Sequence, residues 1–280
     1  MGCFWALLIG VVACTSTRHT AAGHRHGRPP AGSTTTATER ANAPSTTSVA
    51  VVPGVPGAVV TNGSRDRRAV ALTFDSNMTD RMLAELDQGR VASFDNRAVI
   101  DELDSLRVPA TFFLSGKWME RYADETRRLA SDPLFELGTH SYAHRAFHVP
   151  CYRLSALPVT EMLADVQHVE QLLATFTDHP TPYFRFPGGC YDQTALEAIA
   201  PARVTVVQYD VVSGDAFGTS ITAIVDHVLA DTRNGSIVVM HVTGGNTAPL
   251  TAEALPPIVA GLRARGFDLV KISQLLVGGA

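Results

Sequence analysis

Short apolar runs alternate with stretches of helical periodicity from about residue 66 to the end of the chain. Runs rich in β-branched and aromatic residues predict strands at Ala69–Phe74, Ala110–Leu114, Leu134–Gly138, Tyr183–Phe186, Val204–Tyr209, Ile237–His241 and Phe267–Ile272. Apolar spacing predicts helices at Arg97–Leu106, Trp118–Ala130, Thr160–Phe176, Gln193–Ala200, Ile221–Ala230 and Leu255–Arg265. The repeated strand, helix, strand order predicts an α/β fold, with a parallel sheet, outer helices and one barrel-like domain.

The segment before residue 66 has a different character. Phe4–Ala13 is an apolar run of the size of a signal-peptide core, and Val11-Val12-Ala13-Cys14 resembles a lipobox, in which Cys14 would be lipidated. Residues 15–71 contain no Leu, Ile, Met, Phe, Tyr or Trp, which predicts a flexible tether. We therefore assign residues 1–13 to a lipoprotein signal peptide, 14–65 to the tether and 66–280 to the folded domain.

The N-terminal assignment has an alternative. No Lys or Arg precedes Arg18, so the positive region of an ordinary signal peptide is missing. A cleaved secretory signal with an incidental Cys14 is the other interpretation. Either one predicts an exported protein, and the lipid anchor would hold it at the cell membrane.

Charge narrows the choice of partners. Residues 61–280 carry 19 basic against 26 acidic side chains, which argues against a nucleic-acid partner. With 45% apolar residues the chain has enough material for a sizeable core.

Polar residues with catalytic potential stand where predicted strands end. Asp75, Arg185 and His241 end strands, and Asp215 follows another. In α/β folds the carboxyl ends of parallel strands carry the reactive groups, so these residues are expected to converge. His140 and His144 follow a further strand, and their spacing on a helical turn would place both imidazoles on one side as zinc ligands. A catalytic zinc usually has three protein ligands, so a third is missing.

Five motifs in order resemble those of the polysaccharide deacetylase (NodB-homology) family, carbohydrate esterase family 4. They are Thr73-Phe74-Asp75, Thr139-His140-Ser141-Tyr142-Ala143-His144, Arg185-Phe186-Pro187-Gly188-Gly189, the Asp210–Asp215 stretch and Val238-Val239-Met240-His241. The resemblance covers about residues 66–280 and implies a distorted (β/α) barrel, in agreement with the strand pattern.

The resemblance also implies metal-assisted removal of N-acetyl groups from a sugar. His140 and His144 would hold a divalent metal, with zinc preferred and cobalt or another divalent ion as alternatives. Asp75 would be the general base, and His241 would protonate the departing amine.

Other family positions would support these groups. Arg185 would hold Asp75 ionised, and Asp215 would orient His241 or keep it charged. Gly188 and Tyr191 would contact the oxyanion and the substrate.

The chain departs from the family pattern at two motifs. Ser76 stands where the family has a second Asp as third metal ligand. Ser76 itself, Asp80 and His148 are the candidates for that role. The fourth motif has Ala216 after Asp215 where the family has Trp, and Val212 replaces an earlier Asp, so the wall of the groove is altered.

Cys151 and Cys190 remain after the signal region. One follows the His pair and the other follows Gly188-Gly189, so both would border the same site. In an oxidising compartment a disulfide between them is expected. Two unrelated thiols, or a Cys ligand to the metal, are the alternatives.

The resulting hypothesis is an exported, lipid-anchored deacetylase of an N-acetylated glycan, either a cell-wall polysaccharide or a chitin-like oligomer. It would hydrolyse carbon–nitrogen bonds other than peptide bonds. One alternative is a glycan-binding lipoprotein that lost catalysis with the third ligand. Another is a hydrolase of a different amide or ester on the same fold.

Overall fold

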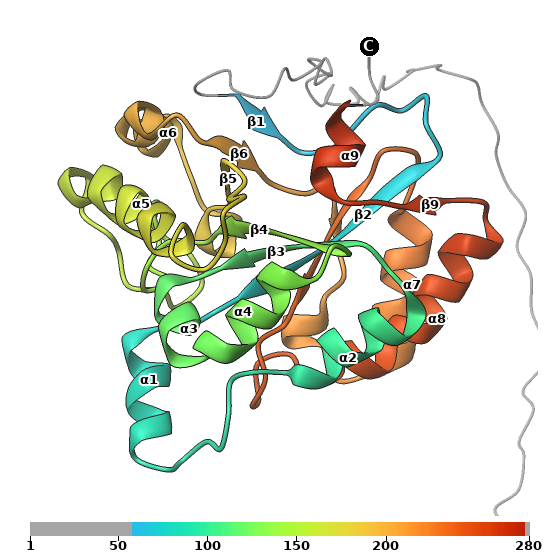
Figure 1. The fold of residues 1–280 in the computed structure, drawn as a ribbon, viewed down its shortest axis with the longest axis horizontal. Coiled ribbons are helices and arrows are strands. Elements are labelled where there is room, and N and C mark those ends of the chain that lie inside the picture. Colours follow the sequence, from blue (N-terminus) through green and yellow to red (C-terminus); the bar gives the residue numbers. More distant parts are fainter. Residues whose placement is uncertain (1–57, 278–280) are drawn as a thin grey trace, which may run out of the picture. The chain divides into compact units, whose positions relative to one another are not determined.

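The computed structural model describes residues 58–277. Over that range nine strands form one sheet, in the order β1-β6-β5-β4-β3-β2-β8-β7, with β9 paired to β2 (Figure 1). Every pairing between these strands is parallel. The expected parallel, distorted (β/α) barrel is confirmed. The strands are β1 (Val59–Val60), β2 (Ala69–Ser76), β3 (Ala110–Leu114), β4 (Phe135–Thr139), β5 (Tyr183–Phe184), β6 (Thr205–Val207), β7 (Val211–Val212), β8 (Ile237–His241) and β9 (Asp268–Leu269).

Helices connect most of these strands and pack against the outside of the sheet. Figure 1 shows α7 and α8 side by side, and the two helices are in contact. The described helices are α1 (Asp80–Asp87), α2 (Arg97–Leu106), α3 (Gly116–Arg121), α4 (Ala123–Ser131), α5 (Val159–Leu173), α6 (Gln193–Ile199), α7 (Ile221–Asp231), α8 (Thr251–Ala264) and α9 (Ile272–Val277), with short 3₁₀ turns η1 (Pro187–Gly189), η2 (Ala200–Ala202) and η3 (Asp215–Phe217).

Side-chain caps define where several helices begin. The Thr79 hydroxyl accepts from the backbone N–H of Met82 at the start of α1. The Asp192 carboxylate accepts from the N–H of Ala195 at the start of α6. Each cap satisfies a backbone donor that has no partner within its helix, which typically contributes about 1 kcal/mol.

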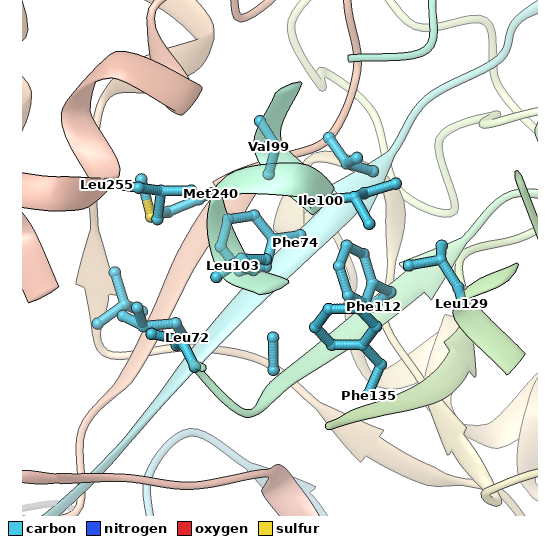
Figure 2. Packing of buried hydrophobic residues seen from close by; sticks show 14 of the residues in the cluster. Leu72, Phe74, Val99, Ile100, Leu103, Phe112, Leu129, Phe135, Met240 and Leu255 are labelled. Atoms are coloured by element: carbon cyan, nitrogen blue, oxygen red, sulfur yellow. The ribbon is translucent and has the colours of Figure 1, made fainter. Parts of the chain in front are cut away.

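The main core lies between the sheet and its outer helices. Leu72 and Phe74 of β2 belong to one buried cluster with Leu103 of α2, and Figure 2 shows these side chains with their neighbours. The ring of Phe74 stacks on that of Phe112 from β3, with centroids 5.4 Å apart. Complete burial of such a side chain contributes roughly 1.5–3 kcal/mol. Truncation of Phe74 to Ala would cost about 3–5 kcal/mol, because a cavity would remain.

Several elements differ from those expected. Residues 59 and 60, assigned to the tether, form β1 and pair with β6, so the folded domain begins before residue 66. The single helix expected at Trp118–Ala130 is divided into α3 and α4 at Tyr122, whose backbone leaves the helical region (φ −119°, ψ 52°). The helix expected at Leu255–Arg265 is α8, which starts at Thr251 and contains Pro256.

Sequence patterns did not predict α1, α9 or β7. The helices α1 and α9 are only eight and six residues long, and the strand β7 has only two residues. Such short elements depend on tertiary contacts more than on local periodicity.

No helix among residues 58–277 is long and apolar enough to cross a membrane. The expected signal peptide, the Cys14 lipidation site and most of the tether lie outside the described residues.

Candidate active site at the carboxyl edge of the sheet

A cleft of about 920 Å³ opens at the carboxyl edge of the sheet. The sequence-predicted site residues that line it are Asp75, His140, His144, Gly188, Asp215 and His241. They lie at or after the carboxyl ends of β2, β4, β5, β7 and β8, and the parallel pairing of the sheet brings these ends to one edge. Asp75 is paired directly with His241 in the register between β2 and β8.

Asp75 is placed on the inner side of β2 by the alternation of side chains along a strand. It shares that side with Thr73. Arg185, which follows β5, donates from Nη1 to Thr73 Oγ1 at 2.8 Å and to Asp75 Oδ1 at 2.7 Å. The guanidinium is completely buried and also donates to the backbone oxygens of Val207 and Gln208. Arg185 therefore fixes the Asp75 carboxylate without lining the cleft itself.

His140 lies on the other side of the same carboxylate. Its Nδ1 is 2.8 Å from the carbonyl oxygen of Arg185, so Nδ1 carries the hydrogen and Nε2 has the free lone pair. That Nε2 is 3.7 Å from Asp75 Oδ2. The Arg185 carbonyl thus orients the His140 imidazole in the way that backbone carbonyls orient metal-binding histidines.

A loop brings the His144 ring next to the His140 ring. The helical turn expected for this pair is wrong, because Ser141 and His144 have φ angles of 60° and 50° and no helix forms there. The left-handed backbone at these residues folds the chain back, and the two ring centroids lie 4.9 Å apart. Nδ1 of His144 is buried and has no hydrogen-bond partner among the described residues.

The protonation of this pair suits a cation. Burial lowers the pKa of His140, although the nearby Asp75 carboxylate acts in the opposite direction. Burial, together with the neighbouring His140, holds the pKa of His144 well below its ordinary value. Both imidazoles are therefore neutral near pH 7, which is the form that binds a divalent metal.

His241 is held by Asp215 from the η3 turn. The carboxylate accepts from the backbone N–H of His241 at 2.7 Å, and its Oδ1 lies 2.8 Å from Nδ1 of the ring. Hydroxyls of Ser213 and Thr251 donate to the same carboxylate. Burial opposes a charge on His241, but the Asp215 carboxylate outweighs it and raises the pKa of His241. Burial likewise opposes the Asp215 charge, and His241 with the donors lowers the pKa of Asp215.

None of the three candidates for a further metal ligand lines the cleft. Ser76 is completely buried, and its hydroxyl accepts from the backbone N–H of Ser115. Asp80 is an exposed residue that pairs with Lys117. His148 is half-exposed, with Nδ1 3.0 Å from Asp192. Within residues 58–277 no group of three or more His, Cys, Asp or Glu side chains has the arrangement of a metal site.

Of the two residues expected to contact the oxyanion and the substrate, one lines the cleft and one does not. Gly188 lines the cleft, but Tyr191 does not. The Tyr191 ring stacks on Phe186, with centroids 5.1 Å apart and planes 11° from parallel. Cys151 and Cys190 are joined by a disulfide, with their Cα atoms 5.9 Å apart. The disulfide links the loop after the His pair to the Gly188 turn.

Four aromatic residues of the cleft, one of them the buried Phe94, were not expected from the sequence. Tyr209 lies just beyond β6, and its hydroxyl is close to Gly189. Tyr152 and Phe217 stand at the mouth of the cleft. The sequence signal for Tyr209 was its place at the end of a predicted strand. Tyr152 and Phe217 lie on loops, whose course no local pattern predicts.

Comparison with known proteins places the fold in a recognised group. The model of the family described as polysaccharide deacetylase matches residues 62–207. A peptidoglycan-N-acetylglucosamine deacetylase from Bacillus cereus is 25% identical over 214 residues, 76% of this chain and 70% of the relative. A chitooligosaccharide deacetylase from Bradyrhizobium sp. is 26% identical over 219 residues, 74% of this chain and 90% of the relative.

Solved structures agree in fold. A peptidoglycan N-acetylglucosamine deacetylase has a TM-score of 0.64 at 23% identity, over 78% of this chain and 92% of that chain. A pseudoenzyme of carbohydrate esterase family 4 from Bacillus anthracis also has a TM-score of 0.64, at 21% identity, over 79% of this chain and 70% of that one.

Proposed function

Because the chain belongs to the polysaccharide deacetylase family, we propose that it is a metal-dependent hydrolase that removes N-acetyl groups from a glycan. The substrate class is a cell-wall polysaccharide or a chitin-like oligomer, and the bond cleaved is an amide carbon–nitrogen bond that is not a peptide bond. Named relatives act on peptidoglycan N-acetylglucosamine and on chitooligosaccharides, which supports this class.

One observation carries the proposal. A carboxylate held by an arginine, Asp75, and an imidazole held by a carboxylate, His241, line the same cleft and are paired in the strand register. Their environments differ in the way that separates a general base from a general acid. Drift after loss of function would have no reason to retain both supporting partners, Arg185 and Asp215.

The two groups divide the proton transfers of amide hydrolysis. Asp75 accepts a proton from the attacking water through the oxygen that Arg185 leaves free, Oδ2. His241 stays protonated to a higher pH because Asp215 raises its pKa, and it donates a proton to the amine nitrogen as the carbon–nitrogen bond breaks. An amine is a poor leaving group without that proton. Gly188 borders the same cleft, and its backbone would supply a contact to the carbonyl oxygen as that oxygen becomes negative.

His140 and His144 are the residues that would hold a divalent cation, with zinc preferred. The donor set fits, because the Nε2 lone pair of His140 is free and the buried Nδ1 of His144 has no partner among the described residues. When bound, such an ion supplies Lewis-acid polarisation of the acetamide carbonyl and a water of lowered pKa. With Ser76 turned to Ser115, two imidazoles remain, so a weakly held ion is expected.

Acetate release tests the function. The purified protein with added Zn²⁺ or Co²⁺ is incubated with N-acetylglucosamine oligomers and with purified peptidoglycan, and acetate and free amines are measured. Asp75→Asn, which retains the shape of the side chain, is the matched control and should lose turnover. Absence of acetate from both substrates with both ions would overturn the proposal.

A glycan-binding protein without catalysis is the second candidate. Two observations favour it: Ser76 in place of a carboxylate ligand, and structural likeness to a pseudoenzyme of carbohydrate esterase family 4. Glycan binding by calorimetry with neither metal binding nor acetate release would select this candidate. Release of acetate from some other amide or ester alone would instead select a different hydrolase on the same fold.

We also propose export and a lipid anchor at Cys14. Support comes from the apolar run before Cys14 and the Thr- and Pro-rich segment after it. Cys14→Ala should move the protein from the membrane fraction to the medium or leave an unprocessed precursor. Cys3→Ala is the matched control, since no apolar run precedes Cys3. An unchanged membrane distribution of the Cys14 variant would contradict the anchor.

A further inference from the structure

Two aromatic side chains stand in water at the mouth of the cleft. Tyr152 is 71% exposed and Phe217 is 76% exposed. Their ring centroids are 5.6 Å apart, and the ring planes are tilted by 31°. Both residues line the cleft. Large apolar surfaces that face each other in solvent are unusual on a protein, and they are typical of a surface that a ligand covers.

The position of Tyr152 is set by its surroundings. It follows Cys151, which the disulfide joins to Cys190, and its backbone is left-handed, with φ 49°. Its ring passes over Gly188, where an added Cβ would lie 3.2 Å from the ring and 2.8 Å from the sulfur of Cys151. The absence of a side chain at Gly188 therefore makes room for the ring. A disulfide and a glycine together fix this aromatic group next to the reaction site.

Phe217 comes from a different segment of the chain. It ends the η3 turn, two residues after Asp215, the residue that holds His241. Its backbone N–H donates to the carbonyl of Gly214. The two rings thus belong to two separate supports of the catalytic site, one behind Gly188 and one behind His241. A ligand that contacts both rings is therefore positioned relative to both Gly188 and His241.

We propose that Tyr152 and Phe217 form an aromatic platform that stacks against a sugar ring of the glycan adjacent to the unit that loses its acetyl group. This inference rests on the proposed function and assigns the part of the substrate beyond the reacting sugar. The faces of a pyranose ring present C–H groups, which pack on the electron-rich faces of aromatic rings. The platform has no formal charge, so it suits the neutral sugar backbone of the glycan.

The platform has a consequence for chain length. A monosaccharide occupies the reacting position only, whereas an oligomer of two or more units also reaches the rings. Removal of the rings should therefore weaken binding of oligomers and change the binding of a monosaccharide much less. A merely structural role for the two residues would weaken both ligands to the same degree.

Calorimetry with N-acetylglucosamine oligomers of one to five units tests this inference. The proteins are Tyr152→Ala, Phe217→Ala and the double variant, each in the Asp75→Asn background so that no substrate is consumed. Oligomer affinity should fall roughly 3- to 10-fold for each ring removed. Tyr152→Phe and Phe217→Tyr, which keep a ring, should restore it. Val159→Ala is the matched control, since Val159 is 49% exposed at the start of α5 and does not line the cleft.

The outcomes separate the platform from the proposed function. Oligomer affinity that is unchanged in the double variant overturns the platform, even if the wild type releases acetate. Oligomer binding that depends on the rings, in a wild type that releases no acetate, supports the platform and overturns the deacetylase. A wild type that binds no oligomer of any length overturns the platform as stated.

Discussion

Nη1 of Arg185 lies 2.7 Å from Oδ1 of Asp75, and neither side chain is more than 6% exposed. A buried charge pair contributes little net stability relative to apolar residues, but loss of one partner leaves an uncompensated charge. The pair is therefore retained for its geometry. It turns one carboxylate oxygen toward the guanidinium and leaves Oδ2 beside the His140 ring.

The first prediction follows from this asymmetry. Arg185→Met should lower the free energy of unfolding by about 3–5 kcal/mol, because it leaves the Asp75 carboxylate buried without its partner. Adding Asp75→Asn should restore much of that loss, since no charge then remains, while turnover stays absent. Urea unfolding of the two single variants and the double variant measures the cycle. Additive effects of the two substitutions would contradict the coupling.

The second prediction concerns pH and His241. The Asp215 carboxylate raises the pKa of His241 against the effect of burial, so the general acid stays protonated to a higher pH. The rate should fall as pH rises through that raised pKa. Asp215→Asn removes the carboxylate, so the alkaline limb of kcat/KM should move to lower pH. Near-UV circular dichroism of the variant controls for folding. An alkaline limb at the same pH in both proteins would exclude His241 as the titrating acid.

Strand ends could be predicted from the sequence because each is marked by a short apolar run. Asp75 and His241 were expected at one edge on that basis, and the register pairs them. The i, i+4 spacing of His140 and His144 gave the correct pair for the wrong reason. A left-handed backbone, rather than a helical turn, brings the rings together, and the i, i+4 spacing does not predict this uncommon conformation at non-glycine residues.

Residues on loops could not be placed from the sequence. His148 continues the spacing of the His pair, yet its loop turns it to Asp192. Tyr152 and Phe217 are 65 residues apart, and their contact depends on the disulfide and on η3. A local sequence pattern covers only neighbouring residues, so it cannot predict tertiary contacts of this kind.

The third prediction concerns the disulfide. It closes a loop with a sequence separation of 39, which restricts the unfolded chain and contributes about 4 kcal/mol by the loop-entropy relation. Cys190→Ser should lower the free energy of unfolding by roughly that amount, and reduction of the wild type should produce a similar loss. Because Cys151 then loses its link to the Gly188 turn, oligomer binding should also weaken. Urea unfolding with and without reductant measures the effect. A loss well below 1 kcal/mol would contradict a stabilising bridge.

The last prediction concerns the metal ligands. Asp80 pairs with Lys117 and His148 with Asp192, so neither completes the site formed by His140 and His144. Two imidazoles should bind Zn²⁺ weakly, and His140→Ala should abolish that binding. Ser76 lies at the carboxyl end of β2, and its hydroxyl accepts from the backbone N–H of Ser115. An Asp side chain at this position would be longer than that of Ser and would carry a negative charge.

Ser76→Asp should therefore raise Zn²⁺ affinity at least about tenfold, which corresponds to ~1.4 kcal/mol. Asp80→Ala and His148→Ala are matched controls that should leave the affinity unchanged. Calorimetric titration of the wild type and these variants measures each value without reference to turnover. A large loss of affinity in either control variant would show that the chain recruits that residue when the ion binds. Ordinary zinc affinity in the wild type, with no gain in Ser76→Asp, would contradict a site of two imidazoles.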